Sequence, residues 1–327
     1  MAQRRIGDTL VSSIGLGCMN VSHAYGQPVT EAVAQRLLGT ALDLGVTHFD
    51  TATLYGFGAN ERLLGAYLKP HRAKLFLASK CGMAGVDGKR VIDGRPETLR
   101  AQCEASLERL QTEVLDLYYL HRKDPKVPLA DSVGALADLV VAGKVRHIGL
   151  SEVSAASLAE AQAIHPIAAV QNEYSLWSRN PELGLSQACR DSGTALVAFS
   201  PLGRGFLGGV LALGDLPASD IRLNMPRFQA PHWARNQPLY QDFARLAADI
   251  GCTPARLALG WLLAQGEHVV PIPGTTSLTH LHDNMGAAVL SLTAADLAAA
   301  SQLINHSTVS GDRYAEATLA EIDTESF

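Results

Sequence analysis

Eight short apolar runs, separated by longer segments of helical periodicity, constrain the fold of this chain more than any other feature. The runs occupy residues 14–19, 46–50, 75–80, 115–121, 145–151, 168–171, 195–200 and 269–274. Near-continuous apolar runs of this length are typical of parallel strands that are buried on both faces. Between two of them, an apolar stripe at helical spacing is formed by Leu99, Cys103, Leu107 and Leu110.

Eight strands that alternate with about eight helices predict an α/β fold, the (β/α)8 TIM barrel. The alternative is an open doubly wound sheet, which requires a glycine-rich first turn. Here Gly15 and Gly17 are followed by Cys-Met-Asn instead. A chain of 327 residues is long enough for two domains, but a barrel of this type also reaches that length. We therefore expect a single barrel domain over residues 1–327.

Two additions to the barrel are predicted near the ends of the chain. Residues 4–7 and 10–13 flank Asp8 and Thr9 and indicate an N-terminal hairpin that closes the barrel floor. Near the C-terminus, the spacing of Thr293 and Asp296 indicates a capped extra helix over residues 297–304. The polar tail at residues 311–327 is expected to be a loop or a frayed end.

One connection is much longer than the others. Residues 201–238 contain five glycines and five prolines. A stretch of this length without regular structure is usually a functional loop or a disordered one. We expect a functional loop, with a surface insertion that has no role as the alternative.

Composition and charge exclude several classes of protein. Lys and Arg number 27 against 32 Asp and Glu, so the net charge of −5 gives no positive field for a nucleic acid. Charged residues interrupt every apolar run well before the roughly 20 residues that a membrane span needs. The first residues lack the apolar stretch of a secretory signal. Five scattered cysteines without a C-x-x-C motif indicate reduced thiols, so we expect a soluble cytoplasmic protein.

Polar residues stand at the carboxyl ends of six predicted strands. They are Asp50, Lys80, His121, Ser151, Gln171 and Ser200. In a (β/α)8 barrel these strand ends share one rim, where active sites are built. We therefore expect these six side chains to meet around one site.

Four residues of this rim form a set that can handle a proton. A tyrosine phenol has a pKa near 10, and a neighbouring ammonium favours the phenolate and lowers that pKa. Lys80 would supply the ammonium for Tyr55, Asp50 would hold Lys80, and His121 would hydrogen-bond the carbonyl oxygen or relay the proton. Taken singly, each has a structural alternative: an Asp50–Lys80 ion pair, a strand-capping His121 and a surface Tyr55. The spacings of the other histidines match no metal site.

Separated motifs resemble those of the aldo-keto reductase superfamily. They are FDTATLYG at 49–56, NERLLG at 60–65, SK at 79–80, LDLYYLH at 115–121, IGLS at 148–151, VQNEYS at 170–175, FSPLGRGF at 199–206 and PIPGT at 271–275. They follow the order of the family from residue 15 to about residue 290. The long PLGRGF loop is most similar to the bacterial and fungal branch that includes pyridoxal and aryl-aldehyde reductases.

The resemblance implies a barrel that transfers a hydride from a nicotinamide cofactor to an aldehyde or ketone. It assigns Tyr55 as the acid, Lys80 and Asp50 as its tuning pair, and His121 as the residue that orients the carbonyl. It also assigns contacts to the cofactor, which are expected from Ser151, Gln171, Phe199, Ser200, Leu202, Gly203, Arg204, Gly274, Thr275, Thr276, Ser277, His280 and Asn284. Of these, Ser151 and Gln171 would bind the carboxamide, Phe199 would stack on the nicotinamide, and 202–204 would surround the pyrophosphate. Glu152 stands where many relatives have asparagine, and its carboxylate would still accept from the carboxamide.

The adenosine end of the cofactor site departs from the family pattern. Many relatives have basic residues after Pro-Gly-Thr and an arginine four residues before the adenine-binding asparagine. Here Thr276, Ser277 and His280 occupy those positions, with Asn284 at the asparagine. Hydroxyls neutralise a 2′-phosphate less well than guanidinium or ammonium groups do. The resemblance therefore implies NADP(H) with modest discrimination over NAD(H).

The substrate pocket is expected in the loops at 19–25, 82–93, 123–126 and 207–233. An apolar lining would come from Tyr25, Phe57, Met83, Phe228 and Trp233, although ordinary loop packing is the alternative. A non-enzymatic reading also stays open, because some members of the family act as channel-associated or regulatory subunits. Beyond a small carbonyl compound the sequence identifies neither the substrate nor the oligomeric state.

Overall fold

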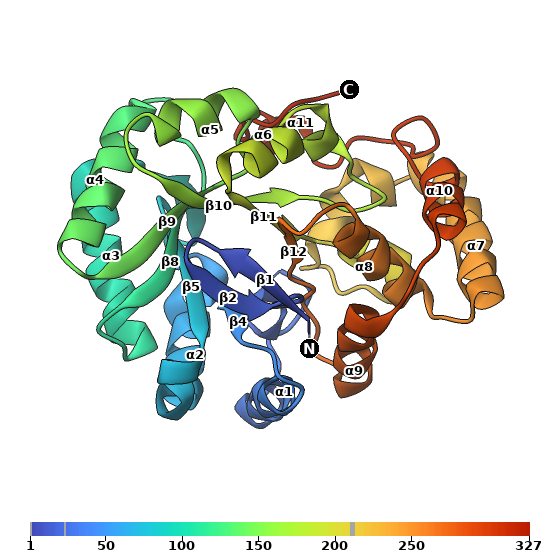
Figure 1. Ribbon diagram of the computed structural model, residues 1–327, viewed down its shortest axis with the longest axis horizontal. Helices are drawn as coiled ribbons and strands as arrows, with labels where there is room; N and C mark the ends of the chain where they lie inside the picture. The colour runs from blue at the N-terminus through green and yellow to red at the C-terminus, as the bar shows by residue number, and fades with distance from the viewer. Residues whose placement is uncertain (1, 23, 210–212) are drawn as a thin grey trace.

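Eight parallel strands form the predicted barrel in a computed structural model that describes residues 2–22, 24–209 and 213–327 (Figure 1). The strands are β3 (Leu16–Gly17), β4 (His48–Asp50), β5 (Phe76–Cys81), β8 (Leu115–Leu120), β9 (Val145–Ser151), β10 (Ile167–Glu173), β11 (Ala195–Phe199) and β12 (Val269–Pro271). Each overlaps one predicted apolar run. Their residues are largely buried, since helices cover the outside and side chains fill the inside.

The barrel closes between its first and last strands. Gly15 N–H donates to the Pro271 carbonyl at 3.0 Å, and Gly17 N–H donates to the Pro273 carbonyl at 3.3 Å. A Cβ atom at Gly17 would lie only 2.7 Å from the Ile272 carbonyl oxygen. Only glycine therefore allows the two strands to approach this closely.

The N-terminal hairpin closes the barrel floor, as predicted. Strands β1 (Gln3–Ile6) and β2 (Thr9–Ser12) pair with Ile6 opposite Thr9, so the turn lies at Gly7 and Asp8, one residue before the expected position. The expected turn was wrong because only glycine readily adopts the left-handed φ of +58° at Gly7. Ile6 and Val11 are fully buried among the lower side chains of the barrel.

Helices surround the barrel, as the apolar periodicity predicted. They are α1 (Glu31–Asp43), α2 (Ala59–Leu68), α3 (Pro96–Leu110), α4 (Leu129–Val141), α5 (Ala155–Gln162), α6 (Leu185–Ser192), α7 (His232–Ile250), α8 (Pro254–Ala264), α9 (Leu278–Gly286), α10 (Ala294–Leu303) and α11 (Glu316–Leu319). The extra helix α10 begins with the expected capping box between Thr293 and Asp296. Short 3-10 turns connect these elements at η1 (Met19–Val21), η2 (Tyr55–Gly58), η3 (Lys69–Lys74), η4 (Asn180–Leu183), η5 (Gly203–Gly208), η6 (Leu213–Asp215), η7 (Ile221–Asn224), η8 (Pro226–Phe228) and η9 (Ala287–Val289).

The long connection after β11 ends earlier than the sequence indicated. The described part contains the four turns η5 to η8, and α7 begins at His232, so Pro238 lies inside a helix. The predicted boundary at 238 was wrong because it took that proline as a loop residue.

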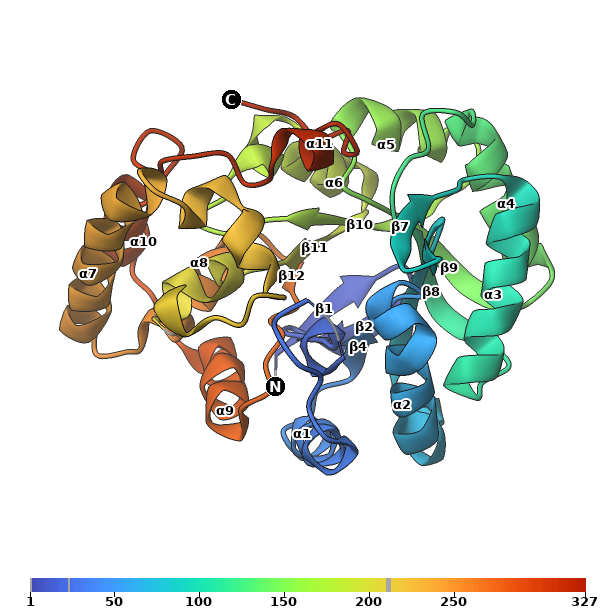
Figure 2. The same ribbon diagram turned by 180° about the vertical axis from the view of Figure 1, so that it is seen from behind.

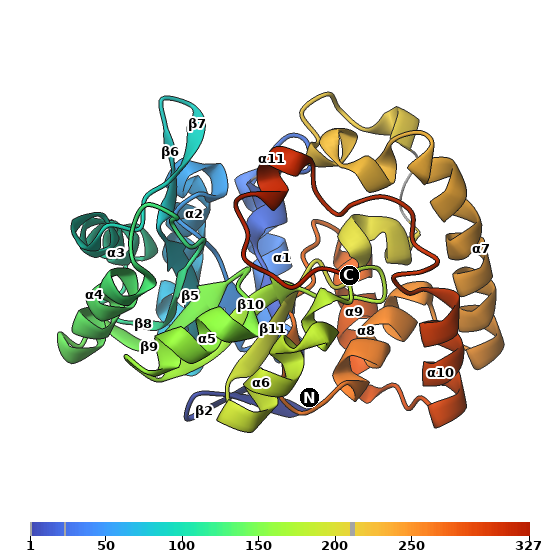
Figure 3. The same ribbon diagram turned by 90° about the horizontal axis from the view of Figure 1, so that it is seen from above.

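Two segments that were expected to be loops have structure of their own. Strands β6 (Met83–Val86) and β7 (Lys89–Ile92) form a hairpin that projects from the barrel (Figure 3). The C-terminal segment, red in Figures 1 and 2, contains α11, and its last residues lie against the start of α5. Asp323 pairs with Val153, and the Glu325 carboxylate accepts from Ala155 N–H, so this segment is not frayed. Within the described ranges, no helix is both long and apolar enough to cross a membrane.

Candidate active site

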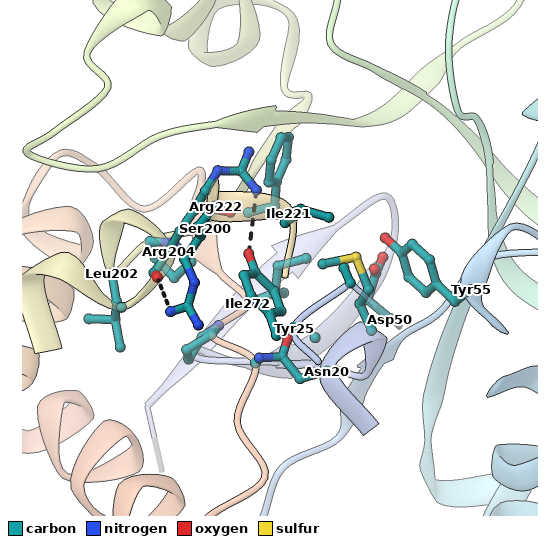
Figure 4. Close-up of a pocket in the computed structure, with 18 of the residues that line it drawn as sticks. Asn20, Tyr25, Asp50, Tyr55, Ser200, Leu202, Arg204, Ile221, Arg222 and Ile272 are labelled. Atoms are coloured by element: carbon teal, nitrogen blue, oxygen red, sulfur yellow. Dashed lines mark hydrogen bonds between the residues drawn. The ribbon is translucent and has the colours of Figure 1, made fainter. Parts of the chain in front are cut away.

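A cavity of about 790 Å³ opens at the carboxyl ends of the barrel strands. Figure 4 shows Asp50 and Tyr55 on one side of it, Arg204 and Arg222 on the other, and Asn20 and Tyr25 between them. All predicted site residues line this cavity except Lys80, which is fully buried, and Gly203. The structure therefore brings together residues that lie up to 234 positions apart, from Asp50 to Asn284.

Asp50, Lys80 and Tyr55 form one hydrogen-bonded chain. Asp50 ends β4, Lys80 lies near the end of the neighbouring β5, and Tyr55 opens the turn η2 that follows β4. The Lys80 ammonium donates to the Asp50 carboxylate, to the Thr51 carbonyl at 2.8 Å and to the Tyr55 hydroxyl at 3.2 Å. All three donors of the ammonium are thus used, which fixes the side chain behind the tyrosine.

Burial dominates the electrostatics of this chain. It raises the pKa of Tyr55 above its usual value of 10, and the nearby Lys80 charge only partly opposes this. Burial also disfavours the charged form of Lys80, but attraction to Asp50 and Tyr55 raises its pKa above the usual value. The expected lowering of the Tyr55 pKa was wrong for the net shift, because the sequence does not show how deeply the phenol is buried. The influence of Lys80 itself has the expected sign and lowers that pKa.

His121 lies against Tyr55 at the edge of the cavity. The two rings are nearly perpendicular, at 84°, and their centroids are 6.0 Å apart. His121 follows β8 directly. Its backbone N–H donates to the Cys81 carbonyl at 2.8 Å, and this bond holds the backbone of His121 beside β5. A carbonyl group placed over Tyr55 would therefore also face the imidazole.

Gln171 contacts the chain of Asp50, Lys80 and Tyr55, and Ser151 contacts Arg122. The Gln171 amide donates to the second Asp50 oxygen at 2.8 Å, and Ser151 Oγ accepts from Arg122 at 3.3 Å. Glu152 was expected to accept from the carboxamide of the cofactor, but it does not line the cavity. Its side chain is buried away from the cavity, where it binds Arg313 and the Glu173 N–H at 2.9 Å.

Phe199 and a left-handed turn form the middle of the cavity wall. The φ angles are positive at Ser200, Gly203, Arg204 and Gly205, which creates a tight concave backbone. The Arg204 guanidinium does not point to an open phosphate site. It binds the Glu173 carboxylate at 2.8 Å and the Tyr314 hydroxyl at 2.7 Å.

The other end of the cavity is the N-terminus of α9. Ser277 caps this helix, and its side chain accepts from the His280 backbone N–H. The side chain of His280 is exposed, whereas that of Asn284 is buried. Asp283 also lines the cavity and pairs with Arg256 at 2.8 Å, which places a carboxylate and a guanidinium next to the predicted adenosine contacts.

The residues of this cavity fit a nicotinamide dinucleotide. An aromatic face, an amide and a hydroxyl stand beside the acid chain, the concave left-handed backbone lies in the middle, and a helix N-terminus with hydroxyls lies at the far end. Amides suit a carboxamide, and aligned backbone donors suit phosphates. Across the described residues, no group of three or more His, Cys, Asp and Glu could hold a metal ion.

Three of the five residues predicted to form an apolar lining border the cavity, and two do not. Tyr25, Phe57 and Met83 line it as predicted. Phe228 and Trp233 instead stack on each other at 5.9 Å in a separate aromatic cluster, so ordinary packing explains them. Residues 23 and 210–212 of the predicted pocket loops lie outside the described residues.

Sequence reasoning missed several residues of the cavity wall. Arg122 and three residues of the C-terminal segment line it, and the three are Tyr314, Ala315 and Thr318. Arg222 also lines it and lies in the predicted pocket loop 207–233, where it was not singled out. For Arg122, the available signal was its position directly after His121, at the barrel rim.

The barrel, the tyrosine–lysine–aspartate chain at its rim and a cavity lined by residues that fit a dinucleotide together indicate a barrel oxidoreductase. The model of the Aldo/keto reductase family matches residues 13–305. Over 307 residues the chain is 44% identical to "Probable aldo-keto reductase 1" of Glycine max, covering 93% of this chain and 88% of the relative. It is 39% identical to "Aldo-keto reductase yakc [NADP(+)]" of Schizosaccharomyces pombe, covering 95% and 94% of the two chains.

A solved structure agrees with these relatives. The glycerol dehydrogenase AKR11B4 of Gluconobacter oxydans is 29% identical, with a TM-score of 0.84 over 93% of this chain and 95% of the other. The chain belongs to the aldo/keto reductase family.

Proposed function

We propose that the protein reduces an aldehyde or ketone to an alcohol with NADPH, and that Tyr55 donates the proton. The observation that carries this is the buried hydrogen-bonded chain from Asp50 through Lys80 to Tyr55 at the wall of the cavity. The Schizosaccharomyces pombe relative, named for NADP(+), supports the choice of cofactor. Residues 1–327 would form one domain that acts on small carbonyl compounds.

The protein groups divide the work around the reacting carbonyl. The bound nicotinamide would supply the hydride. Tyr55 is protonated at neutral pH, as a phenol is, and can give its proton to the carbonyl oxygen. Burial raises its pKa, and the Lys80 charge opposes that rise, which makes the proton easier to give. Lys80, 3.2 Å from the hydroxyl, stabilises the phenolate that remains, and Asp50 keeps Lys80 charged and in place. His121 lies against Tyr55 and would orient the carbonyl oxygen.

The remaining predicted residues would hold the cofactor. We propose that Ser151 and Gln171 bind the carboxamide and that Phe199 stacks on the nicotinamide ring. The turn Ser200–Gly205 would take the pyrophosphate through its backbone, because the Arg204 guanidinium is already bound to Glu173. Gly274, Thr275, Thr276, Ser277, His280 and Asn284 would surround the adenosine half.

Loop residues in the wall of the cavity support a substrate class. Tyr25, Phe57 and Met83 provide an aromatic and apolar lining. We propose aromatic aldehydes as substrates, in line with a branch that includes pyridoxal and aryl-aldehyde reductases.

A panel of aromatic and aliphatic aldehydes tests the proposal directly. The purified protein should oxidise NADPH with members of the panel, followed by the absorbance of the reduced cofactor. Tight NADPH binding without turnover of any aldehyde would contradict the proposal and favour a cofactor-binding regulatory subunit.

A further inference from the structure

Among the described residues, one guanidinium in the wall of the cavity has no carboxylate to neutralise it. In this part of the chain four arginines line the cavity, and three of them form salt bridges, which are Arg90–Glu321, Arg204–Glu173 and Arg222–Asp220. The fourth, Arg122, forms no salt bridge with any carboxylate in residues 2–22, 24–209 and 213–327. The difference sets Arg122 apart from the structural arginines around it.

Arg122 is also deeply buried. Only 9% of its surface is exposed, and its Nε atom is buried without a hydrogen-bond partner. Its Nη1 donates to two neutral acceptors, the His121 carbonyl at 2.6 Å and Ser151 Oγ at 3.3 Å. Burying a guanidinium is costly unless a negative charge compensates it. The uncompensated charge therefore favours an anion that arrives with a ligand.

The charge lies at the reacting end of the cavity. Arg122 directly follows His121 and contacts Ser151, so it lies between the carbonyl-orienting residue and a predicted carboxamide ligand. Burial raises the pKa of Tyr55, and the charge of Arg122 is among the influences that oppose this rise. Lys80 and Asp50 neutralise each other, so Arg122 leaves this end of the cavity positive.

We propose that Arg122 binds a carboxylate on the substrate, so that the preferred substrates are aldehydes or ketones that carry a carboxylate near the carbonyl. This inference rests on the proposed carbonyl reduction and names its substrate class. A guanidinium is the side chain best suited to a carboxylate, because its planar donors match the two oxygens. The aromatic lining of the cavity is compatible with a carboxylated aromatic aldehyde.

Paired substrates test the proposal. The kcat/KM with NADPH is measured for 2-, 3- and 4-carboxybenzaldehyde and for the methyl ester of each. For the favoured isomer, Arg122→Met should lower the ratio of acid to ester by about 10- to 100-fold, the usual value of a hydrogen-bonded charge pair. General damage to the site lowers kcat/KM for the acid and for its ester by the same factor, so the acid-to-ester ratio does not change. Arg122→Lys should retain part of the ratio, and Arg122→Gln replaces the methionine variant if that variant is unstable.

Arg90→Met is the matched control, because Arg90 lines the same cavity but is already neutralised by Glu321. It should keep the acid-to-ester ratio within about threefold. A direct binding measurement complements the rates: benzoate should bind the wild-type protein saturated with NADP+ by titration calorimetry, and Arg122→Met should weaken that binding by a similar factor.

Three outcomes would overturn the proposal. If Arg122→Met lowers acid and ester rates equally and weakens NADPH binding, Arg122 positions the nicotinamide through Ser151 instead. If the acid-to-ester ratio of kcat/KM falls only in Arg90→Met, Arg90 binds the carboxylate of the substrate. If benzoate binds both proteins equally, Arg122 is not an anion site. Absence of turnover with every aldehyde would refute the proposed reduction alone, since benzoate binding still tests Arg122.

Discussion

Lys80 donates a 3.2 Å hydrogen bond to the Tyr55 hydroxyl from a position with no solvent exposure. The same ammonium binds Asp50 and the Thr51 carbonyl, so it cannot rotate away without losing two further partners. Because water does not reach Lys80, its charge acts on the phenol at short range and with little screening. This relationship holds the Tyr55 hydroxyl beside a buried cation.

Replacing the proposed acid should remove most of the turnover. We expect Tyr55→Phe to lower kcat by about 10²–10⁴-fold, because it deletes the positioned proton donor. NADPH binding, followed by fluorescence titration, should change little. Tyr25→Phe is the matched control, since it removes the hydroxyl of another tyrosine in the same cavity and should cost far less. Wild-type turnover in Tyr55→Phe would assign the acid elsewhere.

Lys80→Met should cripple turnover and alter its dependence on pH. Carbonyl reduction requires the protonated phenol, so the rate falls as the pH rises through the pKa of Tyr55, which burial places above 10. Lys80 opposes that rise, and its removal should move the basic limb to higher pH or out of range. The measurement is kcat against pH for both proteins. An unchanged profile would leave Lys80 with a structural role only.

Asp50→Asn should weaken both activity and stability. The change leaves the buried Lys80 charge without its carboxylate, and removing one partner of a buried pair costs about 3–5 kcal/mol. Urea unfolding should show a lower free energy of unfolding, and the loss should shrink when Lys80→Met is added. Equal losses with and without Lys80 would show that the ion pair is not the cause.

The cofactor preference should be for NADPH but modest. The 2′-phosphate would meet the hydroxyls of Thr276 and Ser277, the N-terminus of α9 and the exposed imidazole of His280. None of these is a fixed cation such as a guanidinium or ammonium group. The check is kcat/KM for NADPH and for NADH at neutral pH. A preference above about 10³-fold for NADPH would point to another cation, such as Arg256.

His48 should make the fold sensitive to acid. It is fully buried at the start of β4, and burial lowers its pKa to about 4. An unfolded chain binds a proton to histidine near pH 6.5, so stability is present above that pH and is lost as the pH falls toward 4. The loss attributable to His48 is about 3 kcal/mol.

The comparison with His48→Phe isolates this effect. The decrease in the free energy of unfolding between pH 7 and pH 4.5 should be smaller in the variant than in the wild-type protein. His71→Phe, which replaces an exposed histidine, should retain the wild-type decrease. The same decrease in all three proteins would mean that His48 does not titrate on unfolding.

The amino-acid sequence was sufficient for the barrel because its signals are local. Strands buried on both faces must be apolar throughout, so all eight runs became strands of one sheet. Parallel strands place their carboxyl ends at one rim, so Asp50, His121, Ser151 and Gln171 had to meet there. Asp50, Lys80 and His121, three of the four residues proposed to handle the proton, could be named from this rule. Tyr55 does not end a strand and was proposed because a phenol beside an ammonium can act as an acid.

Tertiary structure alone decided the features that depend on burial and on distant partners. The pKa of Tyr55 rises because the phenol is buried, a quantity that residue spacing does not give. Arg204 donates hydrogen bonds to Glu173 and to Tyr314, which is 110 positions away in the sequence. The C-terminal segment forms part of the cavity wall. Arg122 stands out only when every salt bridge around it is known. Apolar periodicity records which side chains are buried, but the balance of charge in a site depends on which groups the fold brings into contact.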